Sequence, residues 1–352
     1  MKKTILITGG AGFIGSNLCI KLKKNRSYNI IALDNLKRRG SELNLPRLKK
    51  AEVKFIHGDI RNKEDLEELS FDILIECSAE PSVLAGSNNS PEYLFNTNLN
   101  GLINCLEVVR KNKASIIFIS TSRIYPIELV NSLSLVETKK KYSLGKQQKL
   151  VGSSKKGISE QFSLEGYRSL YGASKLCSEI IIKEYVKTYN IKAVINRCGV
   201  IAGPWQMGKV DNGIISLWVA KHMFKKKLSY IGFNGSGKQV RDFLHIDDLF
   251  ELINMQIKNI NKFSGEAYNI GGGVKNSASL LELTDICQKI TKNKIKINKI
   301  KKTRYGDIKL FITDYSKIKK VSGWEPKKSI EQIIIDVSNW IKKNKNNLKE
   351  IL

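Results

Sequence analysis

Apolar and polar positions alternate along the first half of the chain in a way that predicts strands separated by helices. Short apolar runs that end at small or polar residues are typical of buried strands, and they cover residues 5–7, 30–33, 53–57, 71–76, 115–120 and 193–197. Helical spacing of apolar residues follows the glycine-rich run at 9–15 and covers 65–69, 91–111 and 170–190. This order predicts an α/β fold with a Rossmann-type doubly wound parallel sheet.

The second half of the chain departs from this alternation and predicts a smaller, discontinuous C-terminal substrate lobe. Residues 126–168 are polar, rich in lysine and too long for an ordinary connection, so we expect an insertion near the mouth of the site. We expect a dinucleotide-binding domain over 1–197, which contains this insertion, and a lobe over 198–352 that mainly binds substrate. Residues 239–273 are expected to return to the first domain.

A glycine-rich turn joins the first predicted strand to the first predicted helix. Gly9 allows a tight turn out of the strand, Gly12 lets a pyrophosphate approach the backbone, and Gly15 lets helix and strand pack closely. The unpaired amides at the start of the helix suit an anionic diphosphate. Strand, glycine turn and helix in this order predict dinucleotide binding, and the alternative is a purely structural turn.

An acidic residue at the end of the second predicted strand indicates which dinucleotide binds. Asp34 lies near the spacing of about 20 residues from the glycines that is typical of the acid that binds the adenosine ribose. A carboxylate there disfavours the 2′-phosphate of NADP, so we expect NAD. Lys37, Arg38 and Arg39 leave NADP open, because these side chains can receive a phosphate.

Residues after two further strands are candidate cofactor contacts. Asp59 and Ile60 follow the third strand, where the loop in such folds covers the adenine. Ser78 and Ala79 follow the fourth strand, where the cofactor crosses the sheet.

Charge and cysteine content change this picture little. The chain carries 60 Lys and Arg against 33 Asp and Glu, a formal net charge of +27 that alone indicates a nucleic-acid or membrane-surface binder. The lysines are spread over the whole chain without interleaved aromatics, so we expect neither nucleic-acid binding nor membrane insertion. The cysteines and histidines lack metal-ligand and disulfide spacing, so we expect no metal and a cytoplasmic protein with reduced thiols.

A tyrosine and a lysine one helical turn apart carry the clearest chemistry. Tyr171 and Lys175 share a face of the helix predicted over 170–190. A tyrosine has an ordinary pKa of about 10, and a neighbouring ammonium lowers it, so Tyr171 can take a proton from a sugar hydroxyl. Thr121, at the end of the fifth strand, can share a hydrogen bond to the reacting oxygen. The alternative for the pair is a solvated helix face.

Motifs along nearly the whole chain resemble the extended short-chain dehydrogenase/reductase family of nucleotide-sugar epimerases and dehydratases. They are TGGAGFIG, LDNL, HGDIR, STSRIY, YGASK, GKQVRDFLHIDDL and YNIGGG. The resemblance implies tightly held NAD, a catalytic group of Thr121, Tyr171 and Lys175, and a C-terminal lobe that grips the nucleotide. It also implies a homodimer or homotetramer.

The same resemblance implies further contacts. Arg241 and Arg304 are expected to hold the diphosphate or its nucleoside, a role suited to guanidinium. Other expected substrate contacts are Ser122, Arg123 and Asn212. Tyr171 and Lys175 are also expected to contact the cofactor, together with Phe13, Ile14, Asn35, Asn98 and Arg197.

The two residues after Thr121 narrow the range of reactions that the site can catalyse. Sugar 4,6-dehydratases of this family carry Asp-Glu there, since elimination needs an acid and a base, whereas this chain has Ser122 and Arg123. The sequence is most similar to members that invert C2 of a CDP-linked deoxyhexose, so we expect a CDP-linked nucleotide sugar and a role in polysaccharide biosynthesis. A UDP-hexose 4-epimerase, an NAD(P)-dependent sugar-nucleotide reductase and a dinucleotide-sensing protein stay open as alternatives.

Overall fold

The computed structural model describes residues 2–87, 89–209 and 212–352, which divide into two compact units. The first unit comprises Met1–Thr121, Leu170–Arg197 and Phe250–Tyr268, and the second comprises Ser122–Ser169, Cys198–Leu249 and Asn269–Leu352. The segment that returns to the first unit is shorter than the expected 239–273, because β13 (Val240–His245) pairs with strands of the second unit. The expected insertion also belongs to the second unit.

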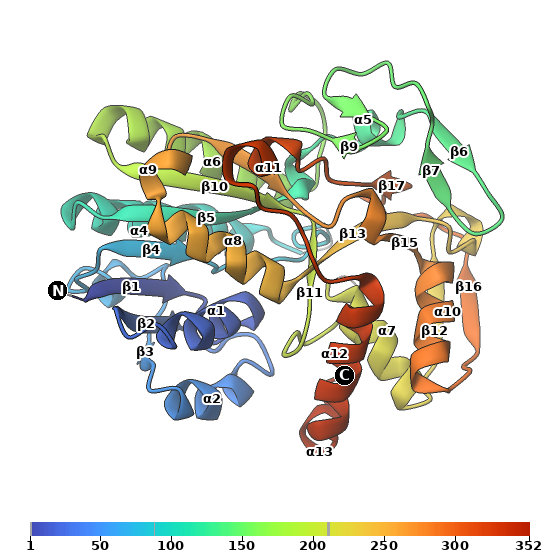
Figure 1. Cartoon of the computed structure of the whole chain (residues 1–352), viewed down its shortest axis with the longest axis horizontal. Helices are drawn as coiled ribbons and strands as arrows, with labels where there is room; N and C mark the ends of the chain where they lie inside the picture. Colours follow the sequence, from blue (N-terminus) through green and yellow to red (C-terminus); the bar gives the residue numbers. More distant parts are fainter. Residues whose placement is uncertain (1, 88, 210–211) are drawn as a thin grey trace. The chain divides into compact units, whose positions relative to one another are not determined.

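The first unit is built on a seven-stranded sheet with the order β14-β10-β5-β4-β1-β2-β3 (Figure 1). The pairs from β5 to β3 are parallel, which confirms the predicted Rossmann-type sheet. Its strands are β1 (Lys3–Thr8), β2 (Tyr28–Asp34), β3 (Lys54–His57), β4 (Ile73–Glu76), β5 (Ser115–Thr121), β10 (Lys192–Cys198) and β14 (Ala267–Ile270).

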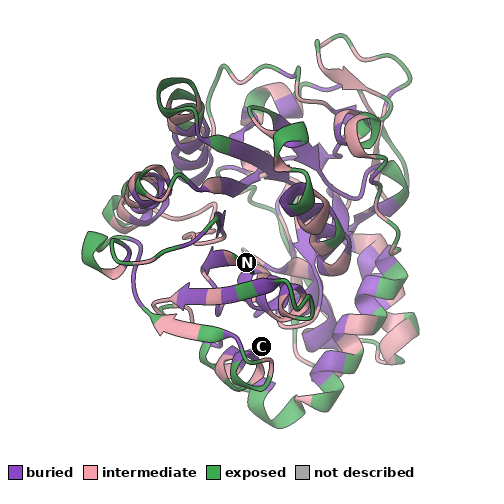
Figure 2. Ribbon diagram, turned by 60° about the vertical axis from the view of Figure 1, so that its left-hand side comes forward, coloured by how far each residue is buried: buried purple, intermediate pink, exposed green. Residues whose placement is uncertain are grey.

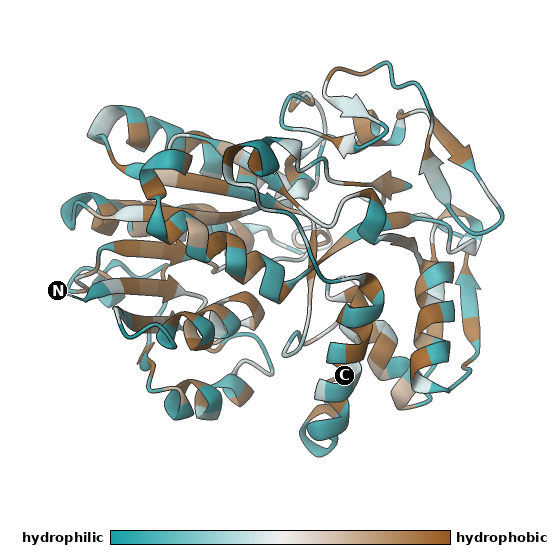
Figure 3. Ribbon diagram, in the orientation of Figure 1, coloured by the Kyte–Doolittle hydropathy of each residue, from teal (hydrophilic) through white to brown (hydrophobic). Residues whose placement is uncertain are grey.

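The central strands of this sheet are buried along nearly their whole length. Every residue of β4 is buried, and so is β5 beyond its first residue. Figure 2 shows that many strands of the molecule carry buried residues. Their side chains are mostly Ile and Leu, which Figure 3 shows as a hydrophobic band through the sheet. Burying each such side chain contributes about 1.5–3 kcal/mol, so these apolar runs fold inward as strands covered by helices.

Helices accompany the strands as predicted, with two local differences. The helix expected over 91–111 is divided into α3 (Glu92–Phe95), a π-helical segment η3 (Asn96–Asn100) and α4 (Gly101–Lys111). The helix expected over 65–69 is a 3₁₀ turn, η2 (Lys63–Asp65). The remaining helices of the sheet region are α1 (Phe13–Lys23), η1 (Glu42–Asn44), α2 (Leu45–Lys50), α6 (Leu170–Tyr189), α8 (Ile246–Lys258) and α9 (Ile260–Phe263).

The second unit contains a four-stranded sheet and a group of packed helices. In the sheet, β13 pairs with β11 (Val200–Ala202), β15 (Ser277–Ser279) and β17 (Leu310–Phe311). A separate pair joins β12 (Leu228–Ile231) to β16 (Ile297–Ile300). The helices are α7 (Ile214–Met223), η5 (Phe233–Gly235), η6 (Val274–Asn276), α10 (Leu280–Thr291), α11 (Ser316–Ser322), α12 (Ile330–Lys343) and α13 (Lys345–Leu348).

The expected insertion forms two small hairpins, and Asn269 anchors the second of them within the second unit. The Asn269 backbone amide donates to Glu160 Oε1 (2.6 Å), and its side-chain Oδ1 accepts from the Tyr125 hydroxyl (2.8 Å). Its Nδ2 donates to the Ile158 carbonyl (2.9 Å). The elements of this segment are η4 (Ser122–Ile124), α5 (Ile127–Asn131), β6 (Leu135–Glu137), β7 (Tyr142–Leu144), β8 (Ser153–Ser154) and β9 (Gly157–Ile158).

Two general features of the described chain bear on function. Its helices include none with both the length and the apolar character to cross a membrane. All six cysteines are free thiols.

Candidate cofactor and catalytic site

The glycine-rich turn has the geometry expected from its sequence. Gly9 has a φ of +62°, and the Gly12 amide donates to its carbonyl oxygen (3.0 Å). Gly12 is the N-cap of α1, and a Cβ on Gly15 would lie 2.2 Å from the Gly9 oxygen. The turn is therefore closed by backbone packing at Gly9 and Gly15, and Phe13 and Ile14 begin the helix. Their contacts with a cofactor stay a prediction.

Asp34 joins the end of β2 to this turn. Its Oδ2 accepts from the Ala11 amide (3.0 Å), and its Oδ1 accepts from the Leu36 amide (2.8 Å). Burial raises the pKa of Asp34, while these backbone hydrogen bonds oppose that shift. The carboxylate thus lies beside the glycine turn, where the adenosine ribose is expected.

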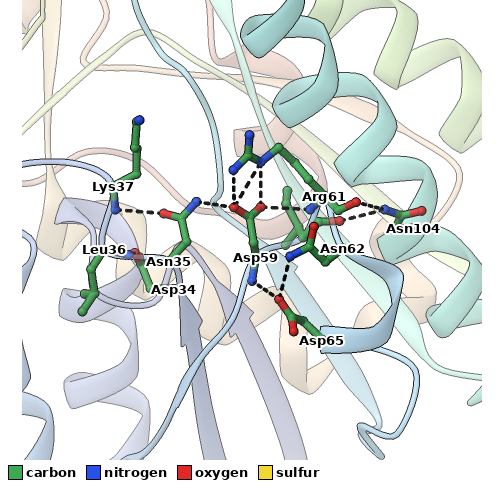
Figure 4. Close-up of polar contacts among 10 residues, drawn as sticks. Asp34, Asn35, Leu36, Lys37, Asp59, Arg61, Asn62, Asp65 and Asn104 are labelled. Atoms are coloured by element: carbon green, nitrogen blue, oxygen red, sulfur yellow. Dashed lines mark hydrogen bonds and ion pairs between the residues drawn. The ribbon is translucent and has the colours of Figure 1, made fainter.

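Asp59 is the centre of a polar cluster next to Asp34 (Figure 4). Its carboxylate accepts from Arg61 Nη2 (2.6 Å) and Asn35 Nδ2 (2.8 Å). Ile60 is 4% exposed, and its carbonyl accepts from Asn104 Nδ2 (2.9 Å). The loop expected to cover the adenine is therefore held on both sides by side-chain hydrogen bonds.

The depressed pKa of Asp59 predicts that part of the stability of the fold is lost in acid. Although burial raises its pKa, hydrogen bonds from Arg61 and Asn35 lower it from 3.8 to about 2. A carboxylate with a depressed pKa stabilises the fold above its unfolded pKa, and this contribution is lost as the pH falls toward the folded value. We expect the unfolding temperature of the wild type to fall more steeply than that of Asp59→Asn between pH of about 4 and about 2. Thermal unfolding measured by circular dichroism across this range tests it.

The matched control for this measurement is Asp285→Asn. Asp285 also pairs with a cation, Lys140 (2.7 Å), but both side chains are exposed, at 55% and 65%. This variant should follow the wild-type pH dependence. Parallel curves for Asp59→Asn and the wild type would contradict the role given to Asp59.

Tyr171 and Lys175 lie in the first turns of α6, and both side chains are buried. Tyr171 is 9% and Lys175 is 2% exposed, and Thr121, at the end of β5, is 8% exposed. The Lys175 ammonium lies 3.5 Å from Glu76 Oε2 and 4.2 Å from the centre of the Phe118 ring. A solvated helix face is therefore contradicted for this pair.

A buried carboxylate joins α6 to the strand that carries Thr121. Glu179 Oε1 accepts from the Ser120 hydroxyl (2.5 Å), and Glu179 Oε2 accepts from Arg197 Nη2 (2.8 Å). Glu179 and Arg197 are 1% and 4% exposed. Because Ser120 precedes Thr121, this network connects the elements that carry Thr121, Tyr171 and Lys175. It also places Arg197 in an ion pair, and its expected contact with the cofactor stays a prediction.

Asn98 lies in the π-helical segment and holds the residues that follow β4. Its Oδ1 accepts from the Glu80 amide (2.8 Å), and its Nδ2 donates to Ser174 Oγ (3.1 Å). Ser78 and Ala79 lie in the same half-buried segment. Asn98 therefore supports the proposed crossing point of the cofactor by tying it to α6.

The expected arginines of the second unit gather around residues 304–308. Arg123 Nη1 donates to the Gly306 carbonyl (3.0 Å), and Arg241 Nη2 donates to the Ile308 carbonyl (2.9 Å). Arg304 pairs with Asp307 (3.3 Å). Burial, and then the charge of Arg123, lower the pKa of Arg241, and the contacts of these arginines with substrate stay predictions.

Ser122 and Asn212 are the two remaining residues that we expect to contact substrate, and they lie far apart in the sequence. Ser122 begins η4, and its carbonyl accepts from the Tyr125 amide (3.3 Å). Asn212 forms a bridge with Lys209, whose amide donates to the Asn212 carbonyl (2.6 Å). Their contacts with substrate stay predictions.

Sequence reasoning missed Glu76 and Glu179. Glu179 lies one turn beyond Lys175 on the same helix, so the spacing Tyr171, Lys175, Glu179 was a usable signal. Glu76 ends an apolar strand, where a carboxylate is unusual, and that contrast was also visible in the sequence.

Comparisons with known proteins match nearly the whole chain. A family model described as "NAD dependent epimerase/dehydratase family" matches residues 5–271. CDP-paratose 2-epimerase of Salmonella typhi is 30% identical over 96% of this chain and 98% of its own length. A putative UDP-glucose 4-epimerase of Methanocaldococcus jannaschii is 31% identical over 97% of this chain and 99% of its own length. UDP-glucuronic acid 4-epimerase from Bacillus cereus, solved in complex with UDP-glucuronic acid and NAD, has a TM-score of 0.80 at 26% identity, over 97% of this chain and 99% of that one.

Proposed function

Since the chain belongs to the NAD dependent epimerase/dehydratase family, we propose that it inverts C2 of a CDP-linked deoxyhexose, from CDP-paratose to CDP-tyvelose. The chain is a sugar-nucleotide epimerase that uses NAD. The similarity to the Salmonella typhi enzyme supports CDP-paratose as substrate. We also propose, from the family resemblance, a cytoplasmic homodimer or homotetramer.

The residues of the glycine turn fit NAD. Gly12 has an extended backbone (φ −71°, ψ −179°) at the start of α1, and the nearest atom that a Cβ there would meet is the Gly9 oxygen, at 3.1 Å. The backbone is therefore accessible where the pyrophosphate is expected, next to the amides of the first helical turn. Asp34 is suitably placed to accept hydrogen bonds from the adenosine ribose.

The observation that carries the proposed reaction is the buried pair of Tyr171 and Lys175 beside the end of β5. When bound, NAD supplies a hydride acceptor that returns the hydride to the other face of a transient keto-sugar, so no external reductant is needed. Tyr171 takes the proton of the C2 hydroxyl and later gives it back. Thr121 donates a hydrogen bond to the reacting oxygen, and Lys175 favours the ionised phenol and holds the cofactor.

Arg123 supports epimerisation over dehydration. Its guanidinium donates to the Gly306 carbonyl, and it puts a cation, which we propose contacts the substrate, at the position where a dehydratase carries a carboxylic acid. With no carboxyl pair after Thr121, the site keeps the oxidation and reduction and lacks the elimination chemistry. Arg241 and Arg304 are proposed to bind the diphosphate.

A UDP-hexose 4-epimerase is the second candidate. The Methanocaldococcus jannaschii relative, described as a putative UDP-glucose 4-epimerase, has nearly the same identity and coverage as the CDP-paratose relative. The same residues perform either reaction, since only the carbon presented to Tyr171 differs.

Proton NMR of the purified enzyme with CDP-paratose in deuterated water, without added cofactor, tests the proposal. We expect CDP-tyvelose to form with little deuterium at C2, because the hydride returns internally. A UDP-hexose is tested as a substrate in a parallel experiment under the same conditions. Conversion of the UDP-hexose alone would replace the proposed substrate with the second candidate, and rapid deuterium incorporation at C2 would contradict hydride return.

A further inference from the structure

Glu76 is a buried carboxylate that contacts the proposed catalytic lysine. It ends β4 and is 1% exposed, and within the described chain no hydrogen bond of good geometry reaches either of its carboxylate oxygens. The Lys175 ammonium is 3.5 Å from its Oε2. Burying an ionised carboxylate that has such weak hydrogen bonds costs several kcal/mol of stability. A purely structural role would therefore not explain why Glu76 is at this position.

The contrast with Glu179 shows what a structural buried ion pair looks like in this unit. Glu179 accepts hydrogen bonds from both Ser120 and Arg197, at 2.5 and 2.8 Å. Glu76 Oε2 instead lies 3.5 Å from the Lys175 ammonium, a longer separation than either hydrogen bond of Glu179. Burial raises the pKa of Glu76, while Lys175 opposes that shift.

Among the described groups around Glu76, Lys175 carries the charge that the carboxylate contacts. From α4 it faces Cys105, a buried thiol whose pKa burial raises well above its ordinary value, so this thiol is neutral. The Phe118 ring of β5 lies beneath the Lys175 ammonium and is apolar. Ser78, on the same segment as Glu76, contributes only a hydroxyl and a backbone amide.

The strand end that carries Glu76 lies against the dinucleotide turn. Glu76 pairs in register with Thr8, the residue before the turn. A Cβ on Gly9 would lie 2.9 Å from the backbone carbonyl of Cys77, the residue after Glu76. The strand end that carries this carboxylate thus lies next to the turn where the dinucleotide is expected.

We propose that Glu76 offsets the charge of Lys175 and thereby favours bound NAD in its oxidised form over NADH. The oxidised nicotinamide ring carries a positive charge and the reduced ring is neutral, so a nearby negative charge stabilises the oxidised form selectively. Without this carboxylate, the Lys175 ammonium alone would favour the neutral ring. Glu76 is therefore a positioning residue that makes hydride return favourable and protects the enzyme from being trapped with NADH. The inference rests on the proposed function only in placing Lys175 beside the nicotinamide.

The ratio of affinities for NAD and NADH tests this inference without measuring activity. Holoenzyme is equilibrated with mixtures of free NAD and NADH, and bound NADH is measured by fluorescence after gel filtration. We expect Glu76→Gln to shift the ratio toward NADH on the order of tenfold, the usual size of one charge at a partly buried site. For this two-electron couple a tenfold change corresponds to about 30 mV. Lys175→Met should shift the ratio toward NAD, and the double variant should return near the wild type.

Two comparisons separate the effect of the Glu76 charge from a structural effect of the Glu76→Gln substitution. Glu107→Gln removes the same charge from a side chain that is 36% exposed on α4, and its ratio should equal that of the wild type. An equal loss of both affinities in Glu76→Gln, with an unchanged ratio, is the structural outcome and overturns the proposal. A shift toward NAD overturns it as well.

The double variant keeps the proposal testable if Glu76→Gln alone does not fold. The step from Lys175→Met to the double variant then isolates the Glu76 charge, and it should again shift the ratio toward NADH. If Lys175→Met leaves the ratio and both affinities unchanged, Lys175 does not lie near the nicotinamide, and both the site assignment and this inference fail. An unchanged ratio with both affinities lowered overturns the inference alone. If Lys175→Met shifts it and the Glu76 step does not, only the inference fails.

Discussion

Tyr171→Phe is expected to lower kcat for epimerisation by about 1,000-fold while the purified protein keeps its NAD. The change removes one hydroxyl, which we propose takes the substrate proton, and general acid–base groups typically contribute 10²–10⁴-fold. The ring of Tyr171 is 9% exposed and keeps its packing in the variant, so the fold should be preserved. Initial rates with the substrate established by NMR, together with the cofactor absorbance of the purified protein, measure both quantities.

Tyr167→Phe is the matched control for this substitution. Tyr167 precedes α6 by a few residues, but its side chain is 74% exposed. Loss of its hydroxyl should leave kcat and bound NAD unchanged. A Tyr171→Phe enzyme that keeps more than about a tenth of the wild-type kcat would contradict the proton-transfer role.

Gly15→Ala is expected to destabilise the protein by about 3 kcal/mol and to remove its bound NAD. The added Cβ would lie 2.2 Å from the Gly9 oxygen and 2.8 Å from the Gly10 Cα. Both neighbours are backbone atoms, so no side-chain rotation relieves the contact and the turn itself must move. Urea unfolding measures the stability, and absorbance of the released cofactor measures the NAD content.

Gly12→Ala separates the cofactor role from the structural role of the same turn. Gly12 has a backbone that alanine adopts freely, and the nearest atom to its Cβ would be the Gly9 oxygen at 3.1 Å. We expect stability within about 1 kcal/mol of the wild type, because nothing in the fold has to move far. Bound NAD should fall by at least about tenfold, since the methyl group occupies the approach of the pyrophosphate. Unchanged NAD content in Gly12→Ala would place the pyrophosphate elsewhere.

Features that depend on neighbours in the chain were readable from the sequence. The strand, glycine turn and helix at the start of the chain follow from apolar periodicity and from Gly9, whose positive φ few other residues adopt. The placement of Tyr171 and Lys175 on one helical face follows from their spacing alone. The family resemblance rested on the same local motifs, and the family match supports it.

The boundaries of the units and of the helices were harder to predict from the sequence. The same local pattern of apolar residues fits either unit. The apolar strand over 240–245 resembles a strand of the first sheet, and its partners β11, β15 and β17 decide that it belongs to the second unit. Likewise, helical periodicity over 91–111 gives no sign of the π-helical segment. There Asn98 serves partners distant in sequence, since its carbonyl accepts from Ser178 Oγ (3.0 Å).

By itself, then, the sequence determined the order of the elements and the glycine turn, and it supplied the residues that we propose move a proton. Only the tertiary structure decided what surrounds those residues, because a buried charge takes its partner from whichever strand lies beside it. Glu76 of β4 contacts Lys175 of α6, and Glu179 joins Ser120 to Arg197. No periodicity records such contacts, since the electrostatic energy of a buried charge depends on distance in space and not along the chain.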